Sequence, residues 1–141
     1  MKKKMNRNSI EPSDRGGEAL ILPLGQYVLR NDAFRRALYT GEHLQLTEMC
    51  VAVGDHIGAE SHSQTDQMIC IVEGEAAVYV GTNPQDATLI GTASGGDAIL
   101  IPAGTFHDLL NAGRTPLRLF SVYAPPNHPY GTVEQTRPTE D

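Results

Sequence analysis

The chain has 141 residues, the length of one domain, with 40% hydrophobic residues, 20% charged residues and no Trp. Four of its eleven basic residues lie among the first seven positions, and the remaining 134 residues carry seven Arg, no Lys and all 17 acids, a net charge of −10. So acidic a body repels phosphate backbones, and three Phe and five Tyr offer few rings for stacking on bases. The composition argues against nucleic-acid partners, and a body without Lys excludes Schiff-base chemistry.

The sequence shows no signal for a membrane helix, for secretion or for a disulfide framework. No apolar run approaches the roughly 18 residues that a membrane helix needs, and the Lys-rich start continues into polar residues rather than into the apolar stretch of a secretory signal. We therefore expect no membrane partner and a cytoplasmic location. Cys50 and Cys70 lie in apolar runs, and because two cysteines make no disulfide framework, we expect both to be reduced core residues.

In chain order, residues 1–17 are polar and charged and predict a disordered basic leader. From residue 18 onward, short apolar stretches alternate with turn residues. No window of eleven or more residues has a clear helical period, and the best helical candidate is 32–38. The stretches that predict strands are 44–53, 67–72, 76–80, 87–92, 98–101, 106–110 and 117–123.

Strands at this spacing, with Gly and Pro between them, are typical of an antiparallel sandwich or barrel. We assign that module to residues 18–126 and expect the Pro-rich tail, 127–141, to run over its surface. The alternate residues Met68, Cys70 and Val72 make the second face of their strand apolar too. A strand that is apolar on both faces is usually covered on both, so we expect a homodimer.

Two segments, 54–67 and 96–111, hold unusual polar residues. Glu60 and His62 are two positions apart, so in an extended chain they point to the same face. Gln67 precedes two alternate isoleucines on the expected core face, and His107 shares its face with a leucine. One carboxylate, two imidazoles and one amide oxygen suit a divalent first-row metal with open positions, and Fe, Mn, Ni, Co and Zn all fit this set.

These segments resemble the paired motifs of the cupin superfamily. The second segment matches in full, at each expected interval, with Gly96, Pro102, Gly104, His107 and Asn111. The first matches in spacing but departs in identity. Glu60 stands where the family usually has its first His, and Gln67 replaces the usual Glu, with Gly74 fixing the register seven residues later.

The resemblance covers residues 34–126 and implies an all-β fold, the double-stranded β-helix or jelly-roll barrel of antiparallel strands, with a metal near its mouth. It implies that the metal ligands are Glu60, His62, Gln67 and His107. The tail from Tyr123 to Val133 further resembles small single-domain cupins often labelled mannose-6-phosphate isomerase-like. That label follows barrel similarity, so we do not carry the isomerase activity over.

We expect two other polar residues near these segments to lie outside the metal site. We expect His56 to be an exposed loop histidine rather than a ligand, and Asp66 to face outward beside Gln67. No general base is tied to the site by spacing. The candidates are Glu48, if it lines the barrel, and His128, if the tail folds over the mouth.

The sequence therefore predicts a metal-binding cupin that acts on a small polar metabolite through a divalent metal, with isomerase-like or oxygenase-like chemistry. The alternative is a non-catalytic module that binds or senses a small molecule in the same cavity. A third interpretation is a barrel that binds no metal and serves only as a scaffold.

Overall fold

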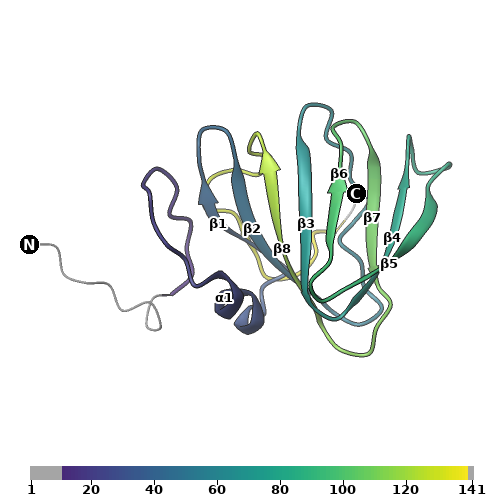
Figure 1. Ribbon diagram of the computed structural model, residues 1–141, viewed down its shortest axis with the longest axis horizontal. Coiled ribbons are helices and arrows are strands. Elements are labelled where there is room, and N and C mark those ends of the chain that lie inside the picture. The colour runs from purple at the N-terminus through teal and green to yellow at the C-terminus, as the bar shows by residue number, and fades with distance from the viewer. Residues whose placement is uncertain (1–10, 140–141) are drawn as a thin grey trace, which may run out of the picture.

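Two antiparallel sheets form the molecule, a computed structural model that describes residues 11–139 (Figure 1). The larger sheet has the order β6-β3-β8-β2-β1-β9, and the smaller has the order β5-β4-β7. The elements are α1 (Leu24–Arg30), β1 (Arg35–Thr40), β2 (Gln45–Val51), β3 (Asp66–Glu73), β4 (Glu75–Gly81), β5 (Thr88–Ser94), β6 (Ala98–Ile101), β7 (Phe106–Asn111), β8 (Leu117–Ala124) and β9 (Val133–Glu134). This architecture confirms the predicted antiparallel double-stranded β-helix.

The core lies between the two sheets, because side chains alternate along each strand and the inward set is apolar. Val51, Leu109 and Leu117 are fully buried there, and removing each such side chain from water contributes about 1.5–3 kcal/mol.

One end of this interior is polar. Gln45, Tyr123 and Gln67 stand in one row across β2, β8 and β3, and all three are buried. Thr47 and Ser121 form the next row on β2 and β8, followed by apolar rows. We call this polar end the mouth of the barrel. Gln67, one of the metal ligands expected from the sequence, lies in it.

The best helical candidate in the sequence, 32–38, does not form a helix. Residues 35–40 form β1, which pairs with β2 on one side and with β9 on the other, so pairing with distant segments overrides the local pattern. The helix lies earlier, at Leu24–Arg30, after Pro23, and buries Tyr27 and Val28 while packing against β2, β3 and β8. Its seven residues are too few to give a helical period in the sequence.

Among residues 11–139, no helix has the length and apolar character needed to cross a membrane.

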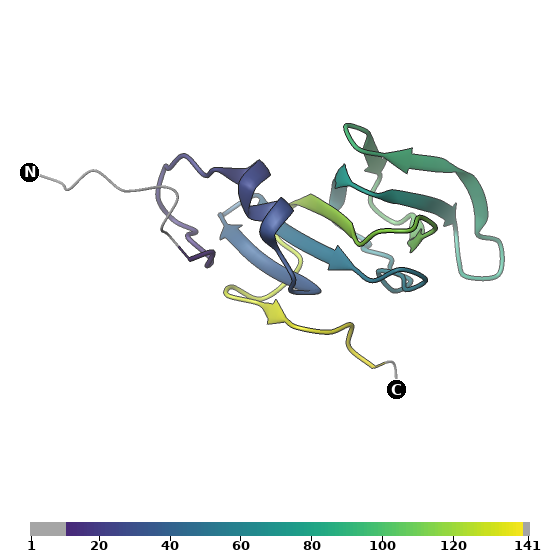
Figure 2. The ribbon, with the colours of Figure 1, turned by 90° about the horizontal axis from the view of Figure 1, so that it is seen from below.

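Part of the N-terminal segment and part of the tail lie beside β1. Residues 1–10 of the predicted leader lie outside the described residues, but Asp14 accepts hydrogen bonds from the backbone N–H groups of Thr40 and Gly131. Figure 2 shows the yellow tail segment alongside the blue strands, where β9 pairs with β1. The tail is therefore attached to the sheet edge over part of its length.

The outer face of the large sheet carries the second apolar set. Cys50 and Cys70 are unpaired, but both are half-buried on this face, so their assignment to the core is wrong.

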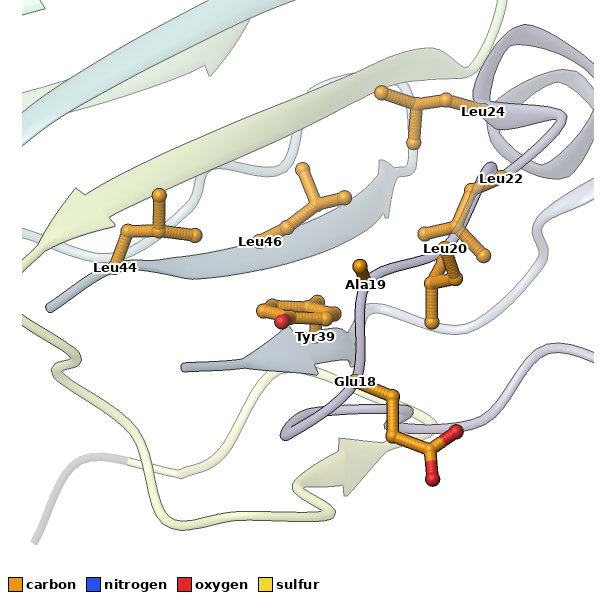
Figure 3. A pocket seen from close by; sticks show the side chains of 8 residues that line it. All are labelled: Glu18, Ala19, Leu20, Leu22, Leu24, Tyr39, Leu44 and Leu46. Carbon is orange, nitrogen blue, oxygen red and sulfur yellow. The ribbon is translucent and has the colours of Figure 1, made fainter. Parts of the chain in front are cut away.

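Close to β1 and β2 an apolar groove of about 400 Å³ opens between this face and the N-terminal segment (Figure 3). Its lining residues are Glu18, Ala19, Leu20, Leu22, Leu24, Tyr39, Leu44 and Leu46.

Glu48 lies on this outer face as well. Strand β2 is regular, and Thr47 and Met49 point inward, so Glu48 points away from the barrel interior. The prediction that Glu48 could line the barrel is therefore wrong. The carboxylate is nevertheless fully buried, with Arg36 at 3.8 Å as its ion-pair partner, and burial raises its pKa to about 7 against the weaker opposing effect of Arg36.

This burial predicts a pH-dependent stability. In the unfolded chain Glu48 loses its proton near pH 4.5, whereas the folded protein keeps it until about pH 7, so stability should fall as the pH rises between these values. Glu48→Gln should remove that slope and raise the free energy of unfolding above pH 7 by up to about 3 kcal/mol. Urea unfolding from pH 4 to 8 measures this. Glu42→Gln is the matched control, because that side chain is 87% exposed; equal slopes in wild type and Glu48→Gln would contradict the prediction.

Candidate metal centre

The loop after β2 joins the small sheet next to β7, and this pairing brings the two motif segments together. Glu60 and His107 exchange backbone hydrogen bonds of 2.9 Å in both directions. Gly58, at φ 93°, turns the chain just before Glu60 in a conformation that strains any residue with a Cβ. The backbone N–H of Gly104 donates to the carbonyl of His62 at 2.8 Å. Backbone bonds thus fix both histidines relative to Glu60.

Three side chains converge at the mouth. Ligand atoms of Glu60, His62 and His107 all lie within 4.8 Å of one another. The Oε2 atom of Glu60 is 3.2 Å from Nε2 of His62 and 3.8 Å from Nε2 of His107. Both imidazoles therefore face the same carboxylate oxygen, a spacing small enough for one ion to touch all three donors.

His107 has a defined tautomer. Its Nδ1 lies 3.1 Å from the carbonyl oxygen of Thr105, which can only accept, so Nδ1 carries the proton. The Nε2 atom is then a bare lone pair, and it is buried without a hydrogen-bond partner. Burial also lowers the pKa of His107, which keeps the ring neutral. An orphaned, buried lone pair aimed at a carboxylate and a second imidazole fits a metal ligand.

Glu60 is held as an anion although it is largely covered. Burial opposes ionisation, but the hydrogen bond from His62 and the positive charge of Arg35 outweigh it and lower the pKa of Glu60. Arg35 donates through Nη2 to Oε1 at 3.1 Å, whereas Oε2 faces the histidines. The two oxygens therefore have different partners.

Gln67 occupies the mouth on the opposite sheet. Its Nε2 donates to the hydroxyl of Ser121 at 2.8 Å, and its Oε1 is buried without a partner. The Nε2 end of the amide faces Ser121, and the Oε1 end is the one left without a partner. Its Oε1 is thus available to a metal or to a metal-bound water, the two roles that the sequence left open.

The tail places His128 at this mouth. Its Nε2 lies 3.2 Å from the hydroxyl of Tyr123, and the Tyr123 ring in turn makes an edge contact with His62, at a centroid distance of 5.8 Å. Burial, with the charge of Arg35 acting in the same direction, lowers the pKa of His128 to about 4. Burial raises the pKa of Tyr123, so its hydroxyl stays protonated.

Two other polar residues lie apart from the cluster. Nδ1 of His56 is 2.8 Å from Oδ2 of Asp108, away from the three converging side chains. Asp66 is exposed and accepts a hydrogen bond from the backbone of Ala103.

The sequence analysis assigned no role at the site to Arg35, Glu134 or Tyr123. Recognising 35–40 as a strand would have shown Arg35 and Ala37 on one face of it. No local signal connects Glu134 to the site, because it lies 99 positions from its partner Arg35.

The hydrogen bond to Thr105 makes the tautomer of His107 testable. In metal-free protein at pH 7 we expect a neutral ring protonated at Nδ1, because burial disfavours the imidazolium and the Thr105 carbonyl accepts that proton. Long-range ¹H–¹⁵N correlation spectra of ¹⁵N-labelled protein distinguish the two tautomers. The exposed His43 is the internal reference. A proton on Nε2 of His107 would contradict the assignment.

Comparison with known proteins adds the family. The model of the Cupin domain family matches residues 47–123, more than half of the chain. "Uncharacterized protein YrkC" of Bacillus subtilis (strain 168) is 40% identical over 124 residues, which are 88% of this chain and 67% of that protein. Protein L612 of Acanthamoeba polyphaga mimivirus is 32% identical over 122 residues, 86% of this chain and 74% of that protein.

A solved structure agrees with these matches. The crystal structure of BH2720 from Bacillus halodurans superposes with a TM-score of 0.86 at 43% sequence identity, covering 89% of this chain and 95% of that one. The family match runs from β2 to β8 and contains both motif segments that meet at the mouth. The chain therefore belongs to the cupin domain family.

Proposed function

We propose that the protein binds a divalent metal ion through Glu60, His62 and His107 and acts on a small polar metabolite at the barrel mouth. The observation that carries this proposal is the buried Nε2 of His107, which has no partner and lies 3.8 Å from Oε2 of Glu60. Gln67 supplies either a fourth ligand or the acceptor for a metal-bound water.

The donor set limits the metal without naming it. Two imidazoles and one carboxylate form the arrangement found with non-haem iron, and Mn, Ni, Co and Zn accept the same donors. When bound, such an ion polarises substrate oxygens as a Lewis acid, and iron also supports chemistry with O₂. Isomerase-like and oxygenase-like reactions are both compatible with this site.

The surrounding side chains orient the ligands and the substrate. Arg35 holds one oxygen of Glu60, and the protonated hydroxyl of Tyr123 is a hydrogen-bond donor at the mouth. Of the two candidate bases from the sequence, Glu48 is on the wrong face, so His128 is the remaining one. Its Nε2 can accept a proton only after giving up the contact with Tyr123.

That limitation favours the second candidate function, a binding or sensing module. A histidine whose pKa is lowered to about 4 is a weak base at neutral pH. A metal-loaded protein that binds small hydroxy acids, sugar phosphates or phenols without converting them would have this second function. Likeness of the tail to the mannose-6-phosphate isomerase-like group adds no activity to either candidate.

Two further expectations accompany the proposal. A cytoplasmic location stays a prediction. A homodimer also stays a prediction, and the outer face of the large sheet supports it, because Leu100 is 71% and Met68 36% exposed beside the cover that α1 provides.

Metal analysis tests the main proposal. Protein purified without a His tag should carry metal, or bind Ni, Mn, Fe or Zn, with a rise in stability of about 2.7 kcal/mol when the free metal is 100 times its Kd. Glu60→Gln keeps the side-chain shape but removes the charge, so it should weaken metal binding at least about tenfold, as losses around metal sites commonly do. His43→Gln is the matched control, since His43 is exposed.

Two results would overturn the metal proposal. One is a metal content below about a tenth per chain with no rise in melting temperature for any of these ions. The other is equal metal affinity of wild type and Glu60→Gln.

Light scattering during gel filtration tests the homodimer. At micromolar concentration we expect twice the chain mass of 15.3 kDa. Leu100→Lys should produce monomers, because a charge is placed in the expected interface, whereas Ile21→Lys, at another exposed apolar site, should not. A monomeric wild-type protein would contradict this expectation.

A further inference from the structure

We propose that the tail segment 127–135 is part of the metal site, and that Glu134 orients the ligand Glu60 through the positioning residue Arg35. This inference rests on the proposed metal site and adds to it a segment that lies outside both sequence motifs.

Arg35 connects the tail to the site. Its side chain is 5% exposed and bridges two carboxylates, with Nη2 donating to Oε1 of Glu60 at 3.1 Å and Nη1 donating to Oε1 of Glu134 at 2.5 Å. A buried guanidinium needs partners for its charge, and here one acid comes from the motif loop and the other from the tail.

This bridge gives the Glu60 carboxylate its direction. Arg35 occupies Oε1, so Oε2 is the atom left for the two imidazoles, at 3.2 Å from His62 and 3.8 Å from His107. Glu134 shares the charge of Arg35. Without Glu134, the guanidinium would pair with Glu60 alone, both oxygens of Glu60 would be drawn toward it, and the carboxylate would be a poorer ligand.

The tail is held in a defined place. Strand β9 pairs with β1 so that Glu134 stands opposite Arg35. The fully buried amide of Gln45 donates to the carbonyl of His128 at 2.8 Å and accepts from the backbone N–H groups of Asn127 and His128. A buried side-chain amide that pairs with the backbone of this segment fixes where the tail crosses the mouth.

A second chain of contacts runs in parallel. The His128 ring makes an edge contact with Tyr123 at a centroid distance of 5.1 Å, and Tyr123 contacts His62 in the same way at 5.8 Å. The tail thus reaches two of the three ligands, Glu60 through Arg35 and His62 through Tyr123.

Coupling of this kind is reciprocal. If a docked tail strengthens metal binding, then a bound metal strengthens tail docking by the same factor. Hydrogen exchange in the tail is therefore a readout that needs neither a substrate nor a variant.

The experiment titrates Co²⁺ into full-length wild type, Glu134→Gln, Glu134→Asp and the control Glu42→Gln, whose side chain is on the surface. We expect Glu134→Gln to raise the Kd for Co²⁺ about 10–100-fold, as loss of partners that orient ligands commonly does. Its Co²⁺ visible spectrum should change, because the carboxylate is oriented differently. Glu134→Asp should recover part of the affinity, and Glu42→Gln should match wild type. Added Co²⁺ should slow backbone exchange in residues 127–135 of wild type.

The outcomes separate this inference from the metal site itself. A wild-type chain that binds no Co²⁺ refutes the site and the inference together. Wild-type binding with an equal Kd in Glu134→Gln refutes the inference alone. A weaker Kd with an unchanged spectrum and unchanged tail exchange also refutes it, because a lost charge would then act only at a distance.

Discussion

The arrangement of the mouth depends on keeping one carboxylate, Glu60, ionised while it is largely covered. Removing an anion from water costs several kcal/mol unless it is paired and hydrogen-bonded. His62 supplies a hydrogen bond to Glu60, and Arg35 supplies the opposite charge. Arg35, itself buried, has more N–H donors than Glu60 satisfies, and the tail provides a second acceptor in Glu134. One buried charge thus accounts for a cation on β1 and for the attachment of a segment far along the chain.

The direction in which Glu48 and Glu60 point decides which groups surround each carboxylate. Glu48 and Glu60 are both shielded from water, but Glu48 points to the outer face and Glu60 into the mouth. The pKa of Glu48 is raised to about 7 because burial dominates over a single ion pair at 3.8 Å. The pKa of Glu60 is lowered because its closer partners outweigh burial. The two environments differ because Glu48 alternates outward on β2, whereas Glu60 lies in the loop after β2 and pairs through its backbone with His107.

The sequence predicted most of the fold because its evidence was local. Alternation and turn residues gave the strands from β2 to β8, and the motif spacing gave the three residues that converge. Arg35 was missed because residues 32–38 show no alternation, and the pairing that makes 35–40 a strand is contributed by β2 and β9. Its two acidic partners lie 25 and 99 positions away. Contacts across such distances leave no mark on a short window of sequence.

The net charge of the side chains at the mouth connects the acidic composition to the proposed function. Glu60, Glu134 and Arg35 together carry one negative charge when the imidazoles are counted as neutral. A cluster with that charge attracts a cation, and a divalent ion reverses the sign to one positive charge. The site so formed favours ligands that present oxygen atoms or negative charge. Residues 8–141 contain no Lys, and the Arg35 guanidinium is already paired with Glu60 and Glu134, so in the proposed metal-loaded protein the ion itself would supply the positive charge that attracts such a ligand.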